Sequence, residues 1–107
     1  MYINKIHWKI EFTDRDEDLY LDGVKRLGIT DKRKHVIYLD NNLKGALLKK
    51  VLLHELTHAW LCSYDYDISV EFEEFLCSFV DTHAEEIIDT LYSLIPQSLE
   101  NRGFVSF

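Results

Sequence analysis

Two histidines and a glutamate stand together in the middle of the chain, in the segment His54-Glu55-Leu56-Thr57-His58. In a helix, residues four apart lie slightly more than one turn apart on the same side, so both imidazoles can reach one Zn²⁺ ion at roughly 2.0–2.1 Å. Glu55 lies between them and a little way round the helix, where its carboxylate can reach a water activated by the metal without binding the metal itself. The spacing therefore predicts His54 and His58 as zinc ligands and Glu55 as the general base.

The alternative interpretation is a pair of packed core histidines with an incidental glutamate. The segment lies in a stretch that is apolar on nearly all sides, with Leu52, Leu53, Leu56 and Ala59 close by. Burying three polar side chains there costs free energy unless a metal or hydrogen bonds satisfy them. This cost favours metal binding.

A catalytic zinc ion has three protein ligands and one open position, so a third ligand must come from elsewhere in the chain. The residues after the motif supply many candidates, namely Glu71, Glu73, Glu74, Asp81, His83, Glu85, Glu86 and Asp89. Glu73 and Glu74 follow His58 by fifteen and sixteen residues, a separation that suits one reversal of the chain. We predict one of them as the third ligand, although acids also suit the first turn of a helix through its dipole. His83 is expected to pack on an apolar stripe, and the later acids to face solvent.

Hydrophobic periodicity predicts the elements that position these residues. Strands are expected over 2–12, 19–30 and 35–40, with a hairpin turn at 31–34. A helix over 43–62, capped by Asn41 or Asn42, should form the buried centre, and a second helix from about Val70 to Leu94 should end at or before Pro96. The order predicts an α+β fold: a small antiparallel sheet of about three strands, then a central helix carrying the histidines and a second long helix.

Length and composition indicate one globular domain spanning residues 1–107. No apolar run approaches the ~20 residues needed to cross a bilayer, so we expect a cytoplasmic protein with no membrane association. Residues 51–101 carry eleven acids and no Lys or Arg, and the net charge is −7, which opposes direct binding to nucleic acid. We expect the two cysteines, Cys62 and Cys77, to pack as small hydrophobic residues.

The segment His54-Glu55-Leu56-Thr57-His58-Ala59-Trp60, the run Glu73-Glu74-Phe75-Leu76-Cys77-Ser78-Phe79-Val80 and the earlier run Val36-Ile37-Tyr38-Leu39-Asp40 resemble the ImmA/IrrE family of zinc metallopeptidases, in a short form common in phages. The resemblance spans roughly residues 27–90. The third ligand of that family is a Glu followed three and four residues later by a small residue and by Asn or Asp. This pattern maps onto Glu74, Cys77 and Ser78, whereas alignment through Phe79 makes Glu73 the ligand. We prefer Glu74, because Ser78 could then hydrogen-bond a ligand histidine.

The resemblance implies a zincin-like core and a zinc-dependent endopeptidase, in which the metal activates water and Glu55 moves the proton. Its substrate would be a protein or peptide, with a transcriptional regulator as one candidate. The strand at Val36–Leu39 could lie at the sheet edge and hold an extended peptide. The alternative is a non-catalytic module in which zinc stabilises a small domain that docks on a repressor, toxin or host factor.

Overall fold

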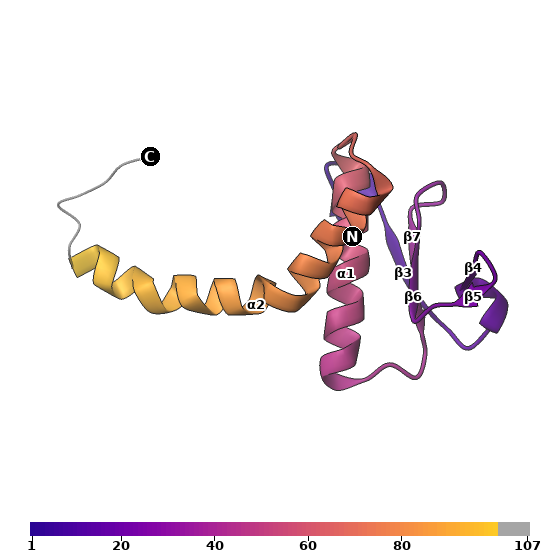
Figure 1. Ribbon diagram of the computed structural model, residues 1–107, viewed down its shortest axis with the longest axis horizontal. Coiled ribbons are helices and arrows are strands. Elements are labelled where there is room, and N and C mark those ends of the chain that lie inside the picture. Colours follow the sequence, from indigo (N-terminus) through magenta and orange to yellow (C-terminus); the bar gives the residue numbers. More distant parts are fainter. Residues whose placement is uncertain (101–107) are drawn as a thin grey trace.

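The computed structural model describes the backbone of residues 1–100 and the side chains of residues 1–95, and it has the predicted α+β order. All strands lie in the first forty residues and both long helices follow them, as Figure 1 shows. The elements are β1 (Tyr2–Ile3), β2 (Ile6–His7), β3 (Lys9–Thr13), the 3₁₀ helix η1 (Asp16–Leu19), β4 (Tyr20–Leu21), β5 (Val24–Lys25), β6 (Gly28–Asp31), β7 (Val36–Asp40), α1 (Gly45–Ser63) and α2 (Val70–Glu100).

The main sheet has three strands in the order β3-β7-β6, and its pairing is mixed. β6 and β7 are antiparallel, as predicted, but β3 runs parallel to β7, with Lys9 beside Val36 and Thr13 beside Asp40. The expectation of a wholly antiparallel sheet is therefore wrong. The chain between β3 and β7 passes through η1, the β4–β5 hairpin and β6, so β7 enters the sheet from the same end as β3.

Two of the predicted strands are interrupted by turns. Asn4 and Lys5 both have positive φ, so the first strand splits into the β1–β2 hairpin and β3. Asp22 and Gly23 have positive φ as well, and they close the two-residue β4–β5 hairpin ahead of β6. Left-handed backbone cannot continue a strand, which explains both interruptions.

The hairpin between β6 and β7 forms at the predicted turn. The Asp31 carboxylate accepts hydrogen bonds from the backbone N–H groups of Arg33 and Lys34, at 2.9 and 3.0 Å. β7 lies in the middle of the sheet and β6 at its edge. The prediction that Val36–Leu39 forms the edge is therefore wrong, and the two edge strands of this sheet are β3 and β6.

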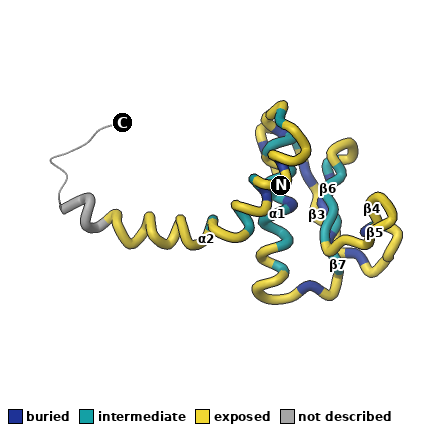
Figure 2. Tube along the Cα trace, viewed as in Figure 1, coloured by how far each residue is buried: buried dark blue, intermediate teal, exposed yellow. Residues whose placement is uncertain are grey.

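The core lies where α1 covers the sheet, and Figure 2 shows buried segments there. It comprises Ile3, Trp8, Ile37, Leu39, Leu43 and Ala59. The Trp8 indole is fully buried and donates its Nε1–H to Ser63 Oγ at 2.8 Å. This bond holds the carboxyl end of α1 against the first hairpin, so the helix bearing the histidines is fixed to the sheet.

α1 differs from its prediction in two respects. Lys44, rather than Asn41 or Asn42, occupies the N-cap position, because Asp40 Oδ1 accepts the Asn42 N–H in a turn that precedes the helix. The helix is also not the buried centre of the domain, since Trp60 is half exposed. The sheet covers one side of α1 and the first part of α2 covers another, so the remaining surface faces solvent.

α2 begins at Val70 as predicted but continues through Pro96 to Glu100. The prediction that it ends at or before Pro96 is therefore wrong: a proline removes one backbone hydrogen bond, which bends or weakens a helix without ending it in every case. The later part of α2 projects away from the body, and the molecule measures 57 × 31 × 26 Å. Within the described residues, neither helix has a stretch long and apolar enough to cross a bilayer.

Candidate metal centre

His54 and His58 project from the same side of α1, one turn apart, with ring centroids separated by 5.1 Å. Their side chains are 20 and 12 % exposed, so both rings are largely shielded but still reach a cleft. The structure thus brings the two predicted ligands together, as helical spacing requires.

Each histidine is anchored through its Nδ1 atom to a carboxylate on α2. His54 Nδ1 lies 2.7 Å from Asp81 Oδ2, and His58 Nδ1 is bonded to Glu73 Oε2. Because an ionised carboxylate can only accept, each Nδ1 carries the proton and donates it. The remaining ring nitrogen of a neutral imidazole, Nε2, then presents a lone pair to the cleft.

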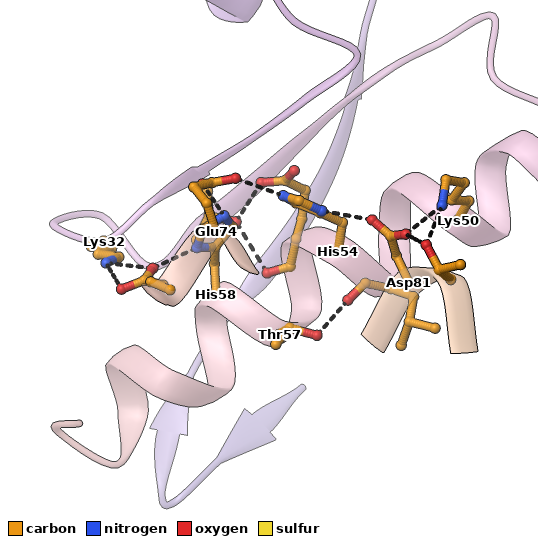
Figure 3. A network of polar contacts seen from close by, with 12 residues as sticks. Lys32, Lys50, His54, Thr57, His58, Glu74 and Asp81 are labelled. Atoms are coloured by element: carbon orange, nitrogen blue, oxygen red, sulfur yellow. Dashed lines mark hydrogen bonds and ion pairs between the residues drawn. The ribbon is translucent and has the colours of Figure 1, made fainter. Parts of the chain in front are cut away.

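A lysine holds each of these two carboxylates in turn (Figure 3). Lys32 Nζ lies 2.8 Å from Glu73 Oε2, and Lys50 Nζ is bonded to Asp81 Oδ1. Burial opposes ionisation of Glu73, but the hydrogen bonds from Lys32 and His58 outweigh it, and its pKa lies below the ordinary value. The same balance lowers the pKa of Asp81, where Lys50 and His54 donate. Both carboxylates are therefore charged acceptors at neutral pH.

Glu74 faces both histidines at once. Its Oε1 lies 3.0 Å from His58 Nε2, and its Oε2 lies 3.4 Å from His54 Nε2. Two imidazole lone pairs and a carboxylate thus converge on one place, and Figure 3 shows Glu74 beside the two rings. A proton on Nε2 or a metal ion relieves the repulsion between these atoms, and imidazole nitrogen and carboxylate oxygen are common zinc ligands. The residues present therefore fit a zinc ion.

Cys77 forms a second possible donor set. Suitable atoms of His54, His58 and Cys77 all lie within 4.8 Å of one another. The thiol is fully buried, and burial with the nearby charges of Glu74 and Glu73 raises its pKa to about 12. Without a metal the thiol keeps its proton, whereas a bound zinc ion deprotonates a coordinating thiol. The prediction that Cys77 only packs is thus incomplete, since the residue also lies within reach of the histidines.

Glu55, the predicted base, is buried beside the sheet rather than beside α2. Its Oε1 accepts a hydrogen bond from Thr30 Oγ1 at 2.9 Å. Gly28 lets β6 approach this closely, because a Cβ at that position would stand 2.9 Å from Val51 Cγ1 and 3.0 Å from Glu55 Cγ. Glu55 lines the same cleft as the histidines.

This cleft has a volume of about 860 Å³ and runs between β6 with the β4–β5 hairpin on one side and the two helices on the other. Its wall includes the free edge of β6, from Gly28 to Thr30, and the cations Lys25, Arg26, Lys32 and Lys50. The cleft therefore combines the converging donors, a buried carboxylate and an unpaired strand edge.

Several residues considered from the sequence lie away from the centre. His83 is exposed and packs against Phe79, with ring centroids 5.0 Å apart, and Glu85 pairs with Lys49. Ser78 is also exposed, and the bonds to the histidines that we expected of it come instead from Glu73 and Asp81.

Sequence reasoning missed the supporting shell of Thr30, Lys32 and Lys50, and it gave Asp81 no role beyond that of a possible ligand. Glu74 and Asp81 are seven residues apart, which places them on the same face of a helix two turns apart, and this spacing could have indicated a shared site. Lys50 lies four residues before His54 on the same face of one helix, a spacing that the sequence also displays. Lys32 lies in the hairpin between β6 and β7, where no periodicity connects it with the motif, and only the fold brings it there.

Comparison of the chain with protein-family models, with curated proteins and with solved structures finds no match.

Proposed function

We propose that this protein is a zinc-dependent metallopeptidase that hydrolyses peptide bonds. The observation that carries the proposal is the convergence of His54 Nε2, His58 Nε2 and the Glu74 carboxylate, with each Nδ1 fixed by a charged acceptor. Carboxylate–histidine pairs of this kind fix the tautomer and orientation of metal-ligating imidazoles. The likeness of the motifs to ImmA/IrrE peptidases supports the same conclusion.

Zinc held by His54, His58 and Glu74 would supply Lewis-acid activation of water and of the scissile carbonyl. Glu55 accepts the proton of the attacking water and returns it to the leaving amine. The hydrogen bond from Thr30 orients the Glu55 carboxylate and occupies only one of its oxygens, so the other remains free to take a proton.

The free edge of β6 provides a means of holding a peptide substrate. An extended chain added to this edge would hydrogen-bond to backbone groups of Gly28–Asp31 and lie along the cleft past Glu55. Main-chain hydrogen bonds of this kind recognise the extended peptide and leave side-chain selection to the rest of the cleft. The resemblance to the ImmA/IrrE family suggests a transcriptional regulator as one substrate.

The second candidate function is a non-catalytic, zinc-stabilised binding module, and Cys77 is the observation that favours it. If Glu74 and Cys77 both bound the metal, His54 and His58 would complete four protein ligands. Structural zinc sites are closed in this way, whereas catalytic sites keep one position open. The number of protein ligands therefore separates the two functions.

The test compares wild-type protein with Glu55→Gln in zinc content and in cleavage of a fluorogenic peptide library. Glutamine is nearly isosteric but cannot accept a proton, so we expect unchanged zinc content and a loss of about 10²–10⁴ in rate, the usual contribution of a general base. Glu86→Gln, an exposed change of the same type, should cleave at the wild-type rate. Equal cleavage by Glu55→Gln would refute the assigned mechanism, and no cleavage by the zinc-loaded wild type would favour the binding module.

A further inference from the structure

Three exposed leucines line the cleft that contains the proposed metal centre. Leu21, Leu27 and Leu47 are 49, 45 and 49 % exposed, and all three border this one cleft. They come from separate parts of the fold, namely β4, the residue just before β6 and the first turn of α1. Clefts that bind ligands are lined mostly by apolar side chains. We call these three residues the leucine subsite.

The leucine subsite lies on one side of the proposed metal centre. On the helix wall, Leu47 lies seven residues before His54, which is two turns, or about 10 Å, away on the same face of α1. On the strand wall, Leu27 lies three residues before Thr30, whose hydroxyl bonds to Glu55. Three residues of extended chain also span about 10 Å. Both walls therefore place the leucines at a similar distance from the centre.

The backbone of β6 determines how a peptide would lie between these walls. The Asp40 N–H donates to the Leu27 carbonyl oxygen at 2.9 Å, so Leu27 bonds towards β7. Backbone groups alternate in direction along an antiparallel strand, and β6 is antiparallel to β7. Gly28 and Thr30 therefore direct their N–H and C=O groups to the free edge, where an added peptide would bond to them.

The same register fixes which peptide side chains would face α1. A Cβ at Gly28 would meet Val51, and the Thr30 hydroxyl bonds to Glu55, so both positions face the helix. Directly opposed residues of neighbouring strands carry their side chains on the same face of a sheet. A peptide residue opposite Gly28 would thus direct its side chain towards Val51, which lines the cleft one turn after Leu47.

We propose that the leucine subsite, together with Val51, takes a large aliphatic side chain of the peptide substrate, about two or three residues to one side of the cleaved bond. This inference rests on the proposed peptidase function and names the class of peptide that the cleft selects. The preference is confined to one side, because the cleft wall beyond Thr30 carries the Lys32–Glu73 ion pair instead of leucines.

The experiment first selects peptides by binding, so that its result does not depend on cleavage. Zinc-loaded Glu55→Gln protein is immobilised, a random library of short peptides is passed over it, and the retained peptides are sequenced by mass spectrometry. The selection is repeated with Leu47→Gln and with Leu91→Gln, each combined with Glu55→Gln. Leu91 is also 49 % exposed but lies outside the cleft, which makes it the matched control. The retained peptides are then offered to zinc-loaded wild-type protein, and the cleaved bonds are mapped.

We expect Leu, Ile, Val or Met to be enriched at one position of the retained peptides, with the enrichment kept in the Leu91→Gln protein and lost in the Leu47→Gln protein. Wild-type protein should cleave these peptides about two or three residues from that position, always on the same side. Replacing the aliphatic residue with Ala should lower the wild-type kcat/KM at least about tenfold, because even one methylene in an apolar pocket is worth about that much.

Retention of no peptide, retention without aliphatic enrichment, or equal enrichment with the Leu47→Gln protein would overturn the leucine subsite. Cleavage with no aliphatic preference, or with the same preference on both sides of the bond, would also overturn it while leaving the peptidase function in place. Enrichment that depends on Leu47, without cleavage by wild-type protein, would support the subsite and contradict the peptidase function.

Discussion

The two parts of α2 differ in what their side chains meet. From Val70 to Ala84 the helix places Glu73, Glu74 and Asp81 against the histidines of α1. Lys32 pairs with Glu73, and Lys50 pairs with Asp81. From Glu85 to Ile95 the helix leaves the body and its large apolar residues are exposed. One continuous helix thus combines a section with a charge-paired face, whose other side exposes Val70, Phe72, Phe75 and Phe79, with a section that lacks a covering element among the described residues.

The comparison teaches that burial does not follow hydrophobicity along this helix. Glu73 is buried because a histidine and a lysine satisfy its carboxylate, while Leu91 is half exposed because α1 does not reach it. Retaining buried carboxylates costs free energy that apolar residues would not, which agrees with the metal site that we propose at the first section. The exposed leucines and isoleucines of the second section form an apolar surface that no described element covers.

The largest difference is expected in zinc content, between a variant of the histidine that the first section of α2 faces and a variant in the second section. His58→Ala removes one of three converging donors and should abolish stoichiometric zinc binding, measured by elemental analysis after gel filtration. Leu91→Glu, in the projecting section, should leave zinc content unchanged. Equal zinc loss in both variants would mean that the sections are not independent, and full retention in His58→Ala would remove His58 from the site.

A second prediction ranks the acids within the first section. Glu74→Ala should lower zinc affinity more than Glu73→Ala, because Glu74 faces both Nε2 atoms whereas Glu73 holds only the far nitrogen of His58. Loss of a carboxylate that orients a ligand histidine costs roughly 10–100-fold in affinity, and loss of a ligand should cost more. Competition against a chelator at fixed pH measures both constants. The reverse ranking would make Glu73 the ligand.

The same titration includes Cys77→Ser, which tests whether the thiol is a fourth protein ligand, as it would be in a structural zinc site. If Glu74 is the third ligand, this variant should bind zinc within a few fold of wild type. A loss as large as that of Glu74→Ala would show that the thiol coordinates the metal.

Sequence reasoning anticipated the centre better than the sheet. The shared helix face of His54 and His58 follows from helical spacing alone, and Glu74 lies where it faces both rings, while its role as a ligand stays a prediction. The reason given for that choice was wrong, since Ser78 is exposed and does not orient a histidine. Local periodicity reports which residues share a helix face, but it does not report which side chains a second helix brings to them.

The parallel pairing of β3 with β7 could not be predicted from alternation, which is the same in either direction. The path of the chain between Thr13 and Val36 decides that pairing, and this path depends on positive φ at Asp22 and His35, neither of which is a glycine. Burial of α1 was overestimated for a related reason. Its apolar residues predict covering elements on every side, and α2 covers only part of it.

A third prediction concerns the support of Glu55 by β6. Gly28→Ala should destabilise the protein by about 1–3 kcal/mol, the usual cost of overpacking, because the added methyl meets Val51 and Glu55 at 2.9 and 3.0 Å. Chemical denaturation of the zinc-free protein measures the change in free energy of unfolding. Gly23→Ala supplies a contrast, since nothing lies within 4 Å of its Cβ position and any effect there reflects positive φ alone. An unchanged stability in Gly28→Ala would contradict the close packing of β6 on α1.

The smallest effect is expected at Lys49 and Lys50, two adjacent residues of α1 that pair with different sections of α2. Lys50 bonds to Asp81, which orients His54, whereas Lys49 pairs with the exposed Glu85. Lys50→Met should weaken zinc affinity by about two- to fivefold and Lys49→Met should not change it, since exposed ion pairs contribute only about 0–1 kcal/mol. Equal zinc affinities in the two variants would show that Lys50 does not support the site.

The central claim is that His54, His58 and Glu74 hold a zinc ion with one position left open, and X-ray absorption at the zinc edge of the purified protein tests it most directly. The account predicts one zinc per chain with two imidazole nitrogens and carboxylate or water oxygens at about 2.0–2.2 Å and no sulfur. A protein that binds no zinc, or a zinc ion with a sulfur ligand at about 2.3 Å, would contradict it.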